Sequence, residues 1–208
     1  MNYTPQQQKL LTHTRKKVHD LFKHHPVPGH DFEHSKRVAE NAEKIARAEH
    51  ARSVFLCELA GWLHDIGRTT EHYTKGNKKS HHELSYEMLR EWLREDRAFD
   101  LLTKQEKLEL LYAVRYHFNN FADKYDTAWI LRDADKLDVF GKIGLKRTVE
   151  FYAGSDEKLN MGLRYAFEIA QFFRTKTAKK IMKEKQLLKP MLNFYKKYLK
   201  NKIKPVKL

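Results

Sequence analysis

The chain of 208 residues is 41% hydrophobic and 33% charged, a balance that excludes a disordered or membrane-embedded protein. No apolar run approaches the roughly 20 residues that a transmembrane helix needs. The formal net charge is +14, but residues 174–208 carry +12 of it, so the preceding part is nearly neutral. A chain of this length is long enough for one well-filled core and short for two domains.

The N-terminus and the cysteine content bear on the compartment. Residues 1–17 read MNYTPQQQKLLTHTRKK and lack the apolar segment of a secretory signal. Cys57 is the one cysteine of the sequence, which excludes a disulfide framework and suits a reducing compartment. We therefore expect a cytoplasmic protein.

Helix signals recur along the whole chain. Thr4, followed by a proline and then Gln7, predicts the start of a first helix, and Asp31 is placed to cap a second one. Thr103 and Glu106 form a capping box that opens another helix. Apolar residues recur at steps of three and four, and we find no alternating strand pattern with hairpin signals. The sequence therefore predicts an all-α fold.

Polar side chains, whose burial costs free energy, interrupt the most apolar of these predicted helices. His34 shares a helix face with Val38 and therefore points to the core. His64 and Asp65 end the apolar segment SVFLCELAGWL, and adjacent side chains at a helix end can lean towards one point. Burying an unpaired carboxylate is energetically expensive, so Asp65 must have either a cation or several hydrogen-bond donors as partners.

A later apolar segment, WILRDADKLDVFG, carries three aspartates. Asp135 and Asp138 share a helix face, whereas Asp133 lies about 200° from Asp135 around the helix and points elsewhere. Two imidazoles and two carboxylates on such helices would satisfy one another by surrounding a divalent cation. This mixed ligand set favours Mn²⁺, with Mg²⁺, Ni²⁺, Co²⁺ or Fe²⁺ as alternatives, over a closed structural zinc site. A cation with open coordination positions promotes attack by water on an electrophile. These residues alone do not indicate whether the attacked atom is phosphorus or carbon.

The histidines, the aspartates and the words around them resemble the HD superfamily of metal-dependent phosphohydrolases, in its small single-domain bacterial branch. The matching words are HDFEHSKRV, LAGWLHDIG, HHELSYEML and DADKLDVFGKIGLKR, so the resemblance spans about residues 28–200. It implies one helical HD domain over residues 1–208. The core of that domain is expected at about residues 28–150, with C-terminal helices and the basic tail of residues 151–208 packed on it.

The resemblance also implies a metal centre and a reaction. The implied mononuclear centre consists of His34, His64, Asp65 and Asp135. The implied reaction is hydrolysis of phosphate esters or anhydrides, including nucleotide pyrophosphohydrolysis, so we expect a nucleotide or a related small phosphate compound as substrate. Two alternatives stay open: a phosphodiesterase acting on cyclic nucleotides or RNA, and a nucleic-acid-binding module with a non-catalytic metal. The basic tail suits nucleic acid, but it would also attract any polyphosphate.

Four further residues are candidate catalytic or substrate-contacting groups. His81 and His117 match positions that hold a second metal or phosphate in related HD proteins. Phe118 stands where some relatives have another histidine, which puts a binuclear centre in doubt. We therefore expect both histidines to donate to the phosphate or to the leaving group. Arg68 follows the HD pair and Lys136 adjoins a metal ligand, so we expect both near the phosphate.

The polar segment GRTTEHYTKGNKKS, residues 67–80, is expected to be a mobile loop beside the site. Its residues Lys75, Lys78 and Lys79 are candidates for phosphate contacts, although a solvated charge run explains them equally well. Asp138 is a candidate to orient a ligand, because metal-bound histidines commonly have a carboxylate partner.

Overall fold

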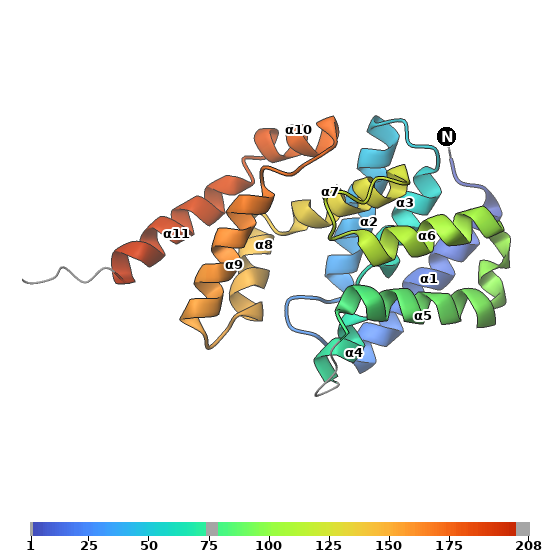
Figure 1. Ribbon diagram of the computed structural model, residues 1–208, viewed down its shortest axis with the longest axis horizontal. Helices are drawn as coiled ribbons and strands as arrows, with labels where there is room; N and C mark the ends of the chain where they lie inside the picture. Colours follow the sequence, from blue (N-terminus) through green and yellow to red (C-terminus); the bar gives the residue numbers. More distant parts are fainter. Residues whose placement is uncertain (1, 74–78, 203–208) are drawn as a thin grey trace, which may run out of the picture.

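The computed structural model describes residues 2–73 and 79–202. Regular structure in these residues is helical throughout, so the predicted all-α fold is confirmed (Figure 1). In chain order the helices are α1 (Pro5–His24), α2 (Phe32–Ala48), α3 (Val54–Leu63), α4 (Arg68–Tyr73), α5 (His81–Glu95), a short 3-10 helix η1 (Arg97–Leu101), α6 (Lys104–Tyr116), α7 (Asp126–Asp138), α8 (Gly141–Phe151), α9 (Asp156–Ile169), α10 (Lys176–Glu184) and α11 (Leu188–Lys202).

Helix α3 lies at the centre of the core. Every residue from Phe55 to Leu63 is buried. A helix that is apolar on all sides is stable only when its neighbours cover every face, and here α1, α2, α6 and α7 all contact α3. Gly61 allows the closest of these approaches, since a Cβ at this position would lie 2.5 Å from the Cα of Ala39 in α2. The end of α3, which carries the histidine–aspartate pair, is thereby fixed against α2.

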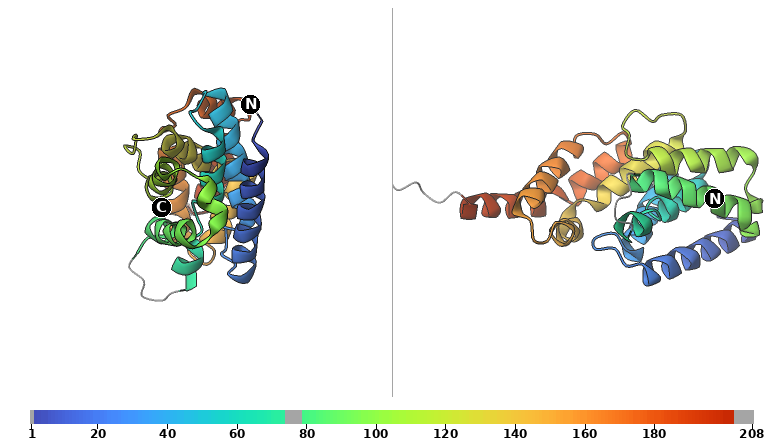
Figure 2. Two further views of the ribbon diagram at one scale, coloured as in Figure 1. Left: turned by 90° about the vertical axis from the view of Figure 1, so that its right-hand side faces the viewer. Right: turned by 60° about the horizontal axis from the view of Figure 1, so that its bottom comes forward.

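The remaining helices form two groups that flank α7. Helices α5 and α6 pack against each other, and α6 contacts α7. In the other group α8 contacts both α9 and α11. The two groups lie towards opposite ends of the molecule in Figure 1 and in the right-hand view of Figure 2. The candidate functional residues lie between them.

The predicted helix starts are found where the sequence places them. Thr4 and Thr103 cap α1 and α6 in complete capping boxes. Oδ1 of Asp31 accepts a hydrogen bond of 2.8 Å from the backbone N–H of His34. Each of these side chains satisfies a backbone N–H that has no partner within its own helix. The cap at Asp31 also sets the point at which α2 begins, which is Phe32, two residues before His34.

The prediction of a loop over residues 67–80 is wrong in part, because helix α4 begins directly at Arg68. The hydroxyl of Thr69 donates to the carbonyl of Ile66 at 2.7 Å, which closes a tight turn and restarts a helix that packs on α5. Lys75 and Lys78 lie outside the described residues. Lys79 forms an ion pair of 2.6 Å with Glu87.

The basic C-terminal segment folds into α10 and α11. Helix α10 contacts α2 and α7, whereas α11 contacts α8. Met191 on α11 is fully buried, and Lys179, Lys180 and Lys183 on α10 are exposed, so these helices combine a packed side with a solvated basic side. None of the described helices combines the length and the apolar character needed to cross a membrane.

Candidate metal centre

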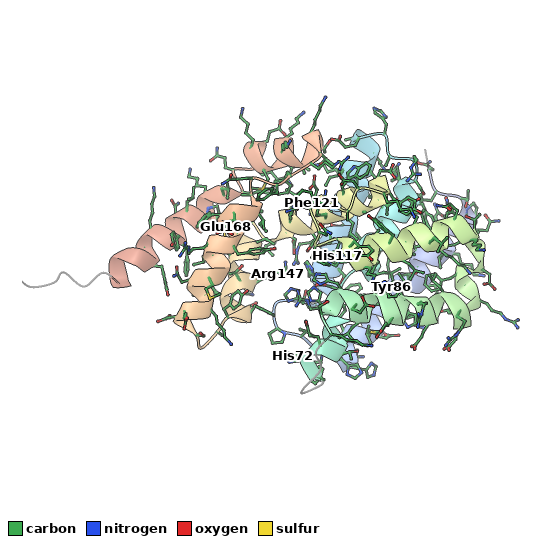
Figure 3. All side chains as sticks on the ribbon, in the orientation of Figure 1. His72, Tyr86, His117, Phe121, Arg147 and Glu168 are labelled. Carbon is green, nitrogen blue, oxygen red and sulfur yellow. The ribbon has the colours of Figure 1, made fainter. Side chains whose placement is uncertain are left out.

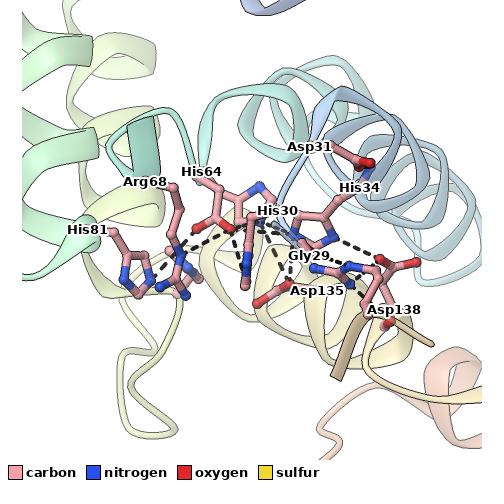
Figure 4. Close-up of polar contacts among 12 residues, drawn as sticks. Gly29, His30, Asp31, His34, His64, Arg68, His81, Asp135 and Asp138 are labelled. Carbon is pink, nitrogen blue, oxygen red and sulfur yellow. Dashed lines mark hydrogen bonds and ion pairs between the residues drawn. The ribbon is translucent and has the colours of Figure 1, made fainter. Parts of the chain in front are cut away.

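Two buried histidines from different helices face each other at the centre of the site (Figure 4). His34 lies in the first turn of α2, and His64 is the residue that ends α3. The Nδ1 atom of His64 donates to the carbonyl of Gly61 at 2.8 Å, and that of His34 lies 2.7 Å from Oδ2 of Asp138. With each Nδ1 occupied, the two Nε2 atoms point at each other across 3.2 Å. Both histidines therefore direct Nε2, the nitrogen that is available to a metal ion, to the same point.

Two carboxylates complete the cluster. Oδ2 of Asp65, in the turn after α3, lies 3.5 Å from Nε2 of His34 and 3.7 Å from that of His64. Oδ1 of Asp135, on α7, lies 3.6 Å and 3.7 Å from the same two nitrogens. Atoms bound about 2.1 Å from one ion stand roughly 3.0 to 3.5 Å apart. The four predicted ligands thus have the donor types that a divalent cation requires, and each of the two carboxylate oxygens lies close to this spacing from both imidazole nitrogens.

The charged groups of the cluster strongly shift one another's pKa values when no ion is bound. Burial opposes a charged imidazole, but the carboxylates of Asp65 and Asp135 outweigh it and raise the pKa of His64 to about 9. Burial likewise opposes ionisation of Asp65 and Asp135, yet His64 next to each carboxyl holds both pKa values well below their usual range. The two carboxylates are therefore ionised at neutral pH and require positive charge between them.

A charged network holds His34 in place. Asp138 accepts from Nδ1 of His34, from Nε of Arg37 at 2.6 Å and from Nη1 of Arg147 at 2.5 Å. Burial raises the pKa of Asp138, but these partners overcome that effect and lower it to about 2. The structure therefore gives Asp138 the position that was predicted for a residue orienting a ligand histidine.

Asp133 points away from the cluster, as the helical spacing predicts. Its carboxylate accepts hydrogen bonds from the backbone N–H groups of Arg174 and Thr175 and from the hydroxyl of Thr175, at 2.7 to 3.2 Å. It therefore fixes the start of α10 on α7 and takes no part in the cluster.

Arg68 and His81 border the cluster on the side of α4 and α5. Nε of Arg68 lies 3.6 Å from Oδ2 of Asp65, and its Nη1 donates to Glu71 at 3.0 Å. Nε2 of His81 lies 3.7 Å from Oδ1 of Asp65, while its Nδ1 lies 3.4 Å from Glu71. Both predicted substrate contacts therefore reach the edge of the cluster, and Glu71 links them.

His117 and Lys136 border the cluster on the side of α6 and α7. The imidazole of His117 is buried 5.2 Å from that of His64, measured between ring centroids, and its Nδ1 donates to the carbonyl of Val114 at 2.8 Å. Burial and His64 lower the pKa of His117 to about 4, so its ring is neutral near pH 7. Nζ of Lys136 donates to Asn120 at 2.6 Å and to the carbonyl of Phe172 at 2.8 Å. Burial and then Arg132 lower the pKa of Lys136 to about 8.

A cavity of about 430 Å³ opens beside the cluster. One part of its wall carries Asp65, Asp135 and the four predicted substrate contacts. The other part is aromatic and consists of Phe151 at the end of α8, Tyr152 directly after it and Tyr165 on α9. Both Arg147 on α8 and His117 at the end of α6 lie near the centre of the molecule, Arg147 on the side of α8 and α9 and His117 on the side of α5 and α6 (Figure 3). The cavity therefore combines cationic side chains and an aromatic wall with the candidate metal centre.

Sequence reasoning missed several residues of this cavity, among them His30, His82 and Arg147. Nε2 of His30 lies 3.9 Å from Oδ2 of Asp65, and its ring meets that of His34 edge-on at 5.5 Å. The sequence offered a signal for each histidine, because His30 lies four residues before His34 and His82 directly follows His81. Arg147 had no such signal, since its approach depends on how α8 folds back on the site.

Comparisons with known proteins bear on the family and on the fold of the chain. A family model described as HD domain matches residues 31–139. A predicted HD superfamily hydrolase from an uncultured Thermotogales bacterium has 26% identity and a TM-score of 0.63, with 92% of each chain covered. Bacillus subtilis YpgQ in complex with ADP has 20% identity and a TM-score of 0.68, over 98% of this chain and all of its own. An HD-superfamily hydrolase from Bacillus thuringiensis has 22% identity and a TM-score of 0.66, over 94% of this chain and 97% of its own.

Proposed function

This chain belongs to the HD-domain family of metal-dependent phosphohydrolases, and we propose that its substrate is a nucleotide, with a nucleoside triphosphate hydrolysed to release pyrophosphate as the first candidate reaction. The observation that carries this proposal is that Asp65 and Asp135 each bring a carboxylate oxygen within 3.7 Å of the two facing histidine nitrogens, at the wall of a cavity that also has cationic and aromatic side chains. A metal ligand set on its own would not select a nucleotide. The cavity beside it supplies groups for both the phosphates and the base.

The four ligands leave room for water and substrate, because they supply fewer donors than the six that Mn²⁺ and Mg²⁺ prefer. Two imidazoles and two carboxylates favour Mn²⁺, with Mg²⁺, Ni²⁺, Co²⁺ and Fe²⁺ as alternatives. When bound there, a divalent cation supplies acidification of water and polarisation of a phosphoryl oxygen.

The residues around the cluster suit a transferred phosphoryl group. We assign to Arg68 a contact with phosphate oxygens, because its guanidinium lies at the cavity wall beside Asp65. His81 and His117 face the same space and are placed to contact the phosphate or the leaving group. Lys136 also lines the cavity, and two of its three ammonium protons are directed to Asn120 and Phe172, which leaves one for substrate.

The wall formed by α8 and α9 suits a nucleoside. Phe151, Tyr152 and Tyr165 line the cavity from this side, and aromatic faces stack on nucleobases without requiring a particular base. Bacillus subtilis YpgQ, which has a similar fold, was solved in complex with ADP. We therefore propose that the phosphates lie towards the metal ligands and the base towards α8 and α9.

The test is a panel of substrates and metals with product identification. The purified chain is incubated with Mn²⁺, Mg²⁺, Co²⁺ or Ni²⁺ and with nucleoside triphosphates, cyclic nucleotides, RNA oligonucleotides or small phosphomonoesters. We expect Mn²⁺-dependent release of pyrophosphate from a nucleoside triphosphate, lost in Asp65→Ala and retained in the exposed control Asp100→Ala. Cleavage of cyclic nucleotides or RNA alone would assign a phosphodiesterase instead. Failure to hydrolyse any substrate, together with salt-sensitive polynucleotide binding, would assign a nucleic-acid-binding module.

A further inference from the structure

The solvent side of α10 and α11 carries most of the net positive charge of the chain. Residues 174–202 contain eleven basic residues and a single acidic one, Glu184. Eight of the lysines are exposed, and we call them the lysine surface: Lys176, Lys179, Lys180, Lys183, Lys185, Lys189, Lys196 and Lys197. Helix α11 lies at the opposite end of the molecule from α1 (Figure 1). The charge is therefore concentrated on one part of the protein.

On α10 the lysines and the buried residues occupy opposite sides of the helix. The lysines at positions 176, 179, 180 and 183 are spaced by three and four residues, so they form one row along the helix. The buried residues lie about 140–240° around the helix from Lys176, and they are Ala178, Ile181 and Met182. The packing of this buried side on the core therefore directs the row of lysines towards solvent.

The lysine surface continues from α10 onto α11 across a hollow of about 500 Å³. Lys185 and Lys189 line this hollow, and Lys142 lines it from the first turn of α8. Lys196 lies two helical turns beyond Lys189 on the same face of α11, whereas Met191 on the opposite face is buried. Three separate elements therefore bring lysines to one place, and the surface extends from there along both helices.

These charges have few partners within the chain. Nζ of Lys180 lies 3.8 Å from Oε1 of Glu184, and none of the other seven lysines of the surface forms an ion pair with a described residue. Like charges three or four residues apart destabilise a helix, and cations in the first turn, such as Lys176 and Lys179, oppose the helix dipole. The row therefore costs stability in the free chain, and an anion bound along it would offset that cost.

A nucleic acid fits the lysine surface better than a membrane does. A helix that lies on a bilayer inserts exposed apolar side chains, but those of α10 are buried in the protein. Among the described side chains of α10 and α11, Leu192 is the one large apolar side chain that is exposed, which is too little for insertion. The phosphates of a DNA strand follow one another at about 3.4 Å along the helix axis. They can therefore contact successive lysines of a row that runs about 10 Å along α10.

We propose that the lysine surface binds the phosphate backbone of a nucleic acid independently of the base sequence. Lysine ammonium groups act as point charges on phosphates, and contacts to phosphates position a nucleic acid without reading its bases. None of the eight lysines lines the cavity beside the metal centre. The surface therefore adds a binding function to the chain, and this function does not depend on which substrate is hydrolysed.

The experiment measures binding by fluorescence anisotropy in EDTA, so that no metal ion takes part. The full chain is titrated into labelled single-stranded RNA and duplex DNA, each in two unrelated sequences, at several KCl concentrations. The surface variant combines four changes on α10: Lys176→Gln, Lys179→Gln, Lys180→Gln and Lys183→Gln. The matched control removes the same charge from exposed lysines of α1 and α6: Lys9→Gln, Lys16→Gln, Lys23→Gln and Lys104→Gln.

We expect the wild-type chain to bind the two sequences of each nucleic acid alike, with an affinity that falls steeply as KCl rises. Each lysine in contact with a phosphate of duplex DNA contributes about 0.9 to the slope of log affinity against log salt. The surface variant should therefore have a slope smaller by about 3 and bind at least about tenfold more weakly at 0.1 M KCl. The matched control should stay close to the wild type.

Thermal unfolding checks that both variants fold, and a variant with Lys189→Gln, Lys196→Gln and Lys197→Gln repeats the test on α11. Equal weakening in the surface variant and the matched control would overturn the proposal, because net charge alone would then explain binding. Absence of binding to either nucleic acid at 0.1 M KCl would also overturn it. Binding only to vesicles that contain phosphatidylserine would assign the surface to a membrane instead.

Because the readout is binding without metal, the outcome is independent of hydrolysis. A chain that binds nucleic acid through the lysine surface and hydrolyses none of the nucleotides would contradict the proposed function and leave this surface standing.

Discussion

Nδ1 of His34 on α2 lies 2.7 Å from Oδ2 of Asp138 on α7, and both residues are buried. This contact fixes which nitrogen of His34 faces the other ligands, because a carboxylate held by two arginines accepts the proton of Nδ1. It also joins α2 and α7, which pack side by side: α2 supplies one ligand, and α7 supplies both a ligand and the group that orients His34.

Removing the negative charge of Asp138 tests this relationship. In Asp138→Asn the side chain keeps its shape, but it can present an N–H to His34 and no longer neutralises Arg37 and Arg147. We expect Mn²⁺ affinity to fall by about 10- to 100-fold, as measured by titration calorimetry. Asp100→Asn, an exposed control, is expected to bind Mn²⁺ like the wild type. Unchanged affinity in a folded Asp138→Asn variant would show that Asp138 does not position His34.

Metal affinity is expected to rise with pH. The pKa of His64 is raised to about 9 in the metal-free chain, above its ordinary value of 6.5, despite the opposing effect of burial. Protonation of His64 therefore stabilises the metal-free fold fully below about pH 6.5, and this stabilisation is lost as pH rises through 9. A cation must displace that proton, so affinity should increase up to about pH 9 and then level off.

Calorimetry in two buffers of different ionisation enthalpy measures directly how many protons are released when the metal binds. Near pH 7.5 we expect release of about one proton for each ion that enters the metal centre. Binding without proton release between pH 6.5 and 9 would contradict the assignment of His64 as a ligand.

Gly67 is expected to tolerate no side chain. Its N–H donates to Oγ of Ser85 at 2.8 Å, and a Cβ at this position would clash with the backbone N of Ser85 and lie 2.5 Å from the carbonyl oxygen of His81. In Gly67→Ala the start of α5 must move away, which displaces His81 from Asp65. We expect a loss of about 1–3 kcal/mol in the free energy of unfolding, measured with denaturant. Ser85→Ala removes only the hydrogen bond, so an equal loss in both variants would argue against the steric explanation.

The aromatic wall predicts that loss of an aromatic ring weakens binding of a substrate with a base more than that of a substrate without one. Tyr165 on α9 lines the cavity and is largely exposed, so Tyr165→Ala should fold normally. Stacking of a base on an aromatic ring contributes about 1–3 kcal/mol, so KM for a nucleoside triphosphate should rise about tenfold or more. Inorganic triphosphate has no base, and its hydrolysis should change little. Tyr165→Phe keeps the ring and should retain the wild-type KM, and equal effects on both substrates would place the base elsewhere.

Helical spacing was enough to predict that His34 faces the core and that Asp135 and Asp138 share one face of their helix. The apolar sequence of α3 likewise indicated that the histidine–aspartate pair ends a buried helix. Such inferences depend on neighbours along one helix, which the sequence contains. The choice of Asp135 over Asp138 as a ligand came from the family resemblance, because both aspartates share a face.

Contacts between distant elements could not be predicted in this way. His82 has no partner along its own helix that suggests a site, and it meets His117 only because α5 packs on α6. Arg147 reaches Asp138 from α8 after the chain has turned back at Gly141, where φ is +77°. The tight turn before α4 also escaped prediction, since it depends on the close approach of Gly67 to α5.

The most direct test of the central claim compares Mn²⁺ binding and hydrolysis in one variant. Asp135→Ala removes a ligand whose side chain is 30% exposed, so the fold should survive the change. Binding of Mn²⁺ to the metal centre, followed by electron paramagnetic resonance, and hydrolysis of the preferred substrate should both be lost. Hydrolysis that persists in a folded Asp135→Ala chain without Mn²⁺ in the metal centre would contradict the assignment of the four-ligand cluster as the catalytic centre.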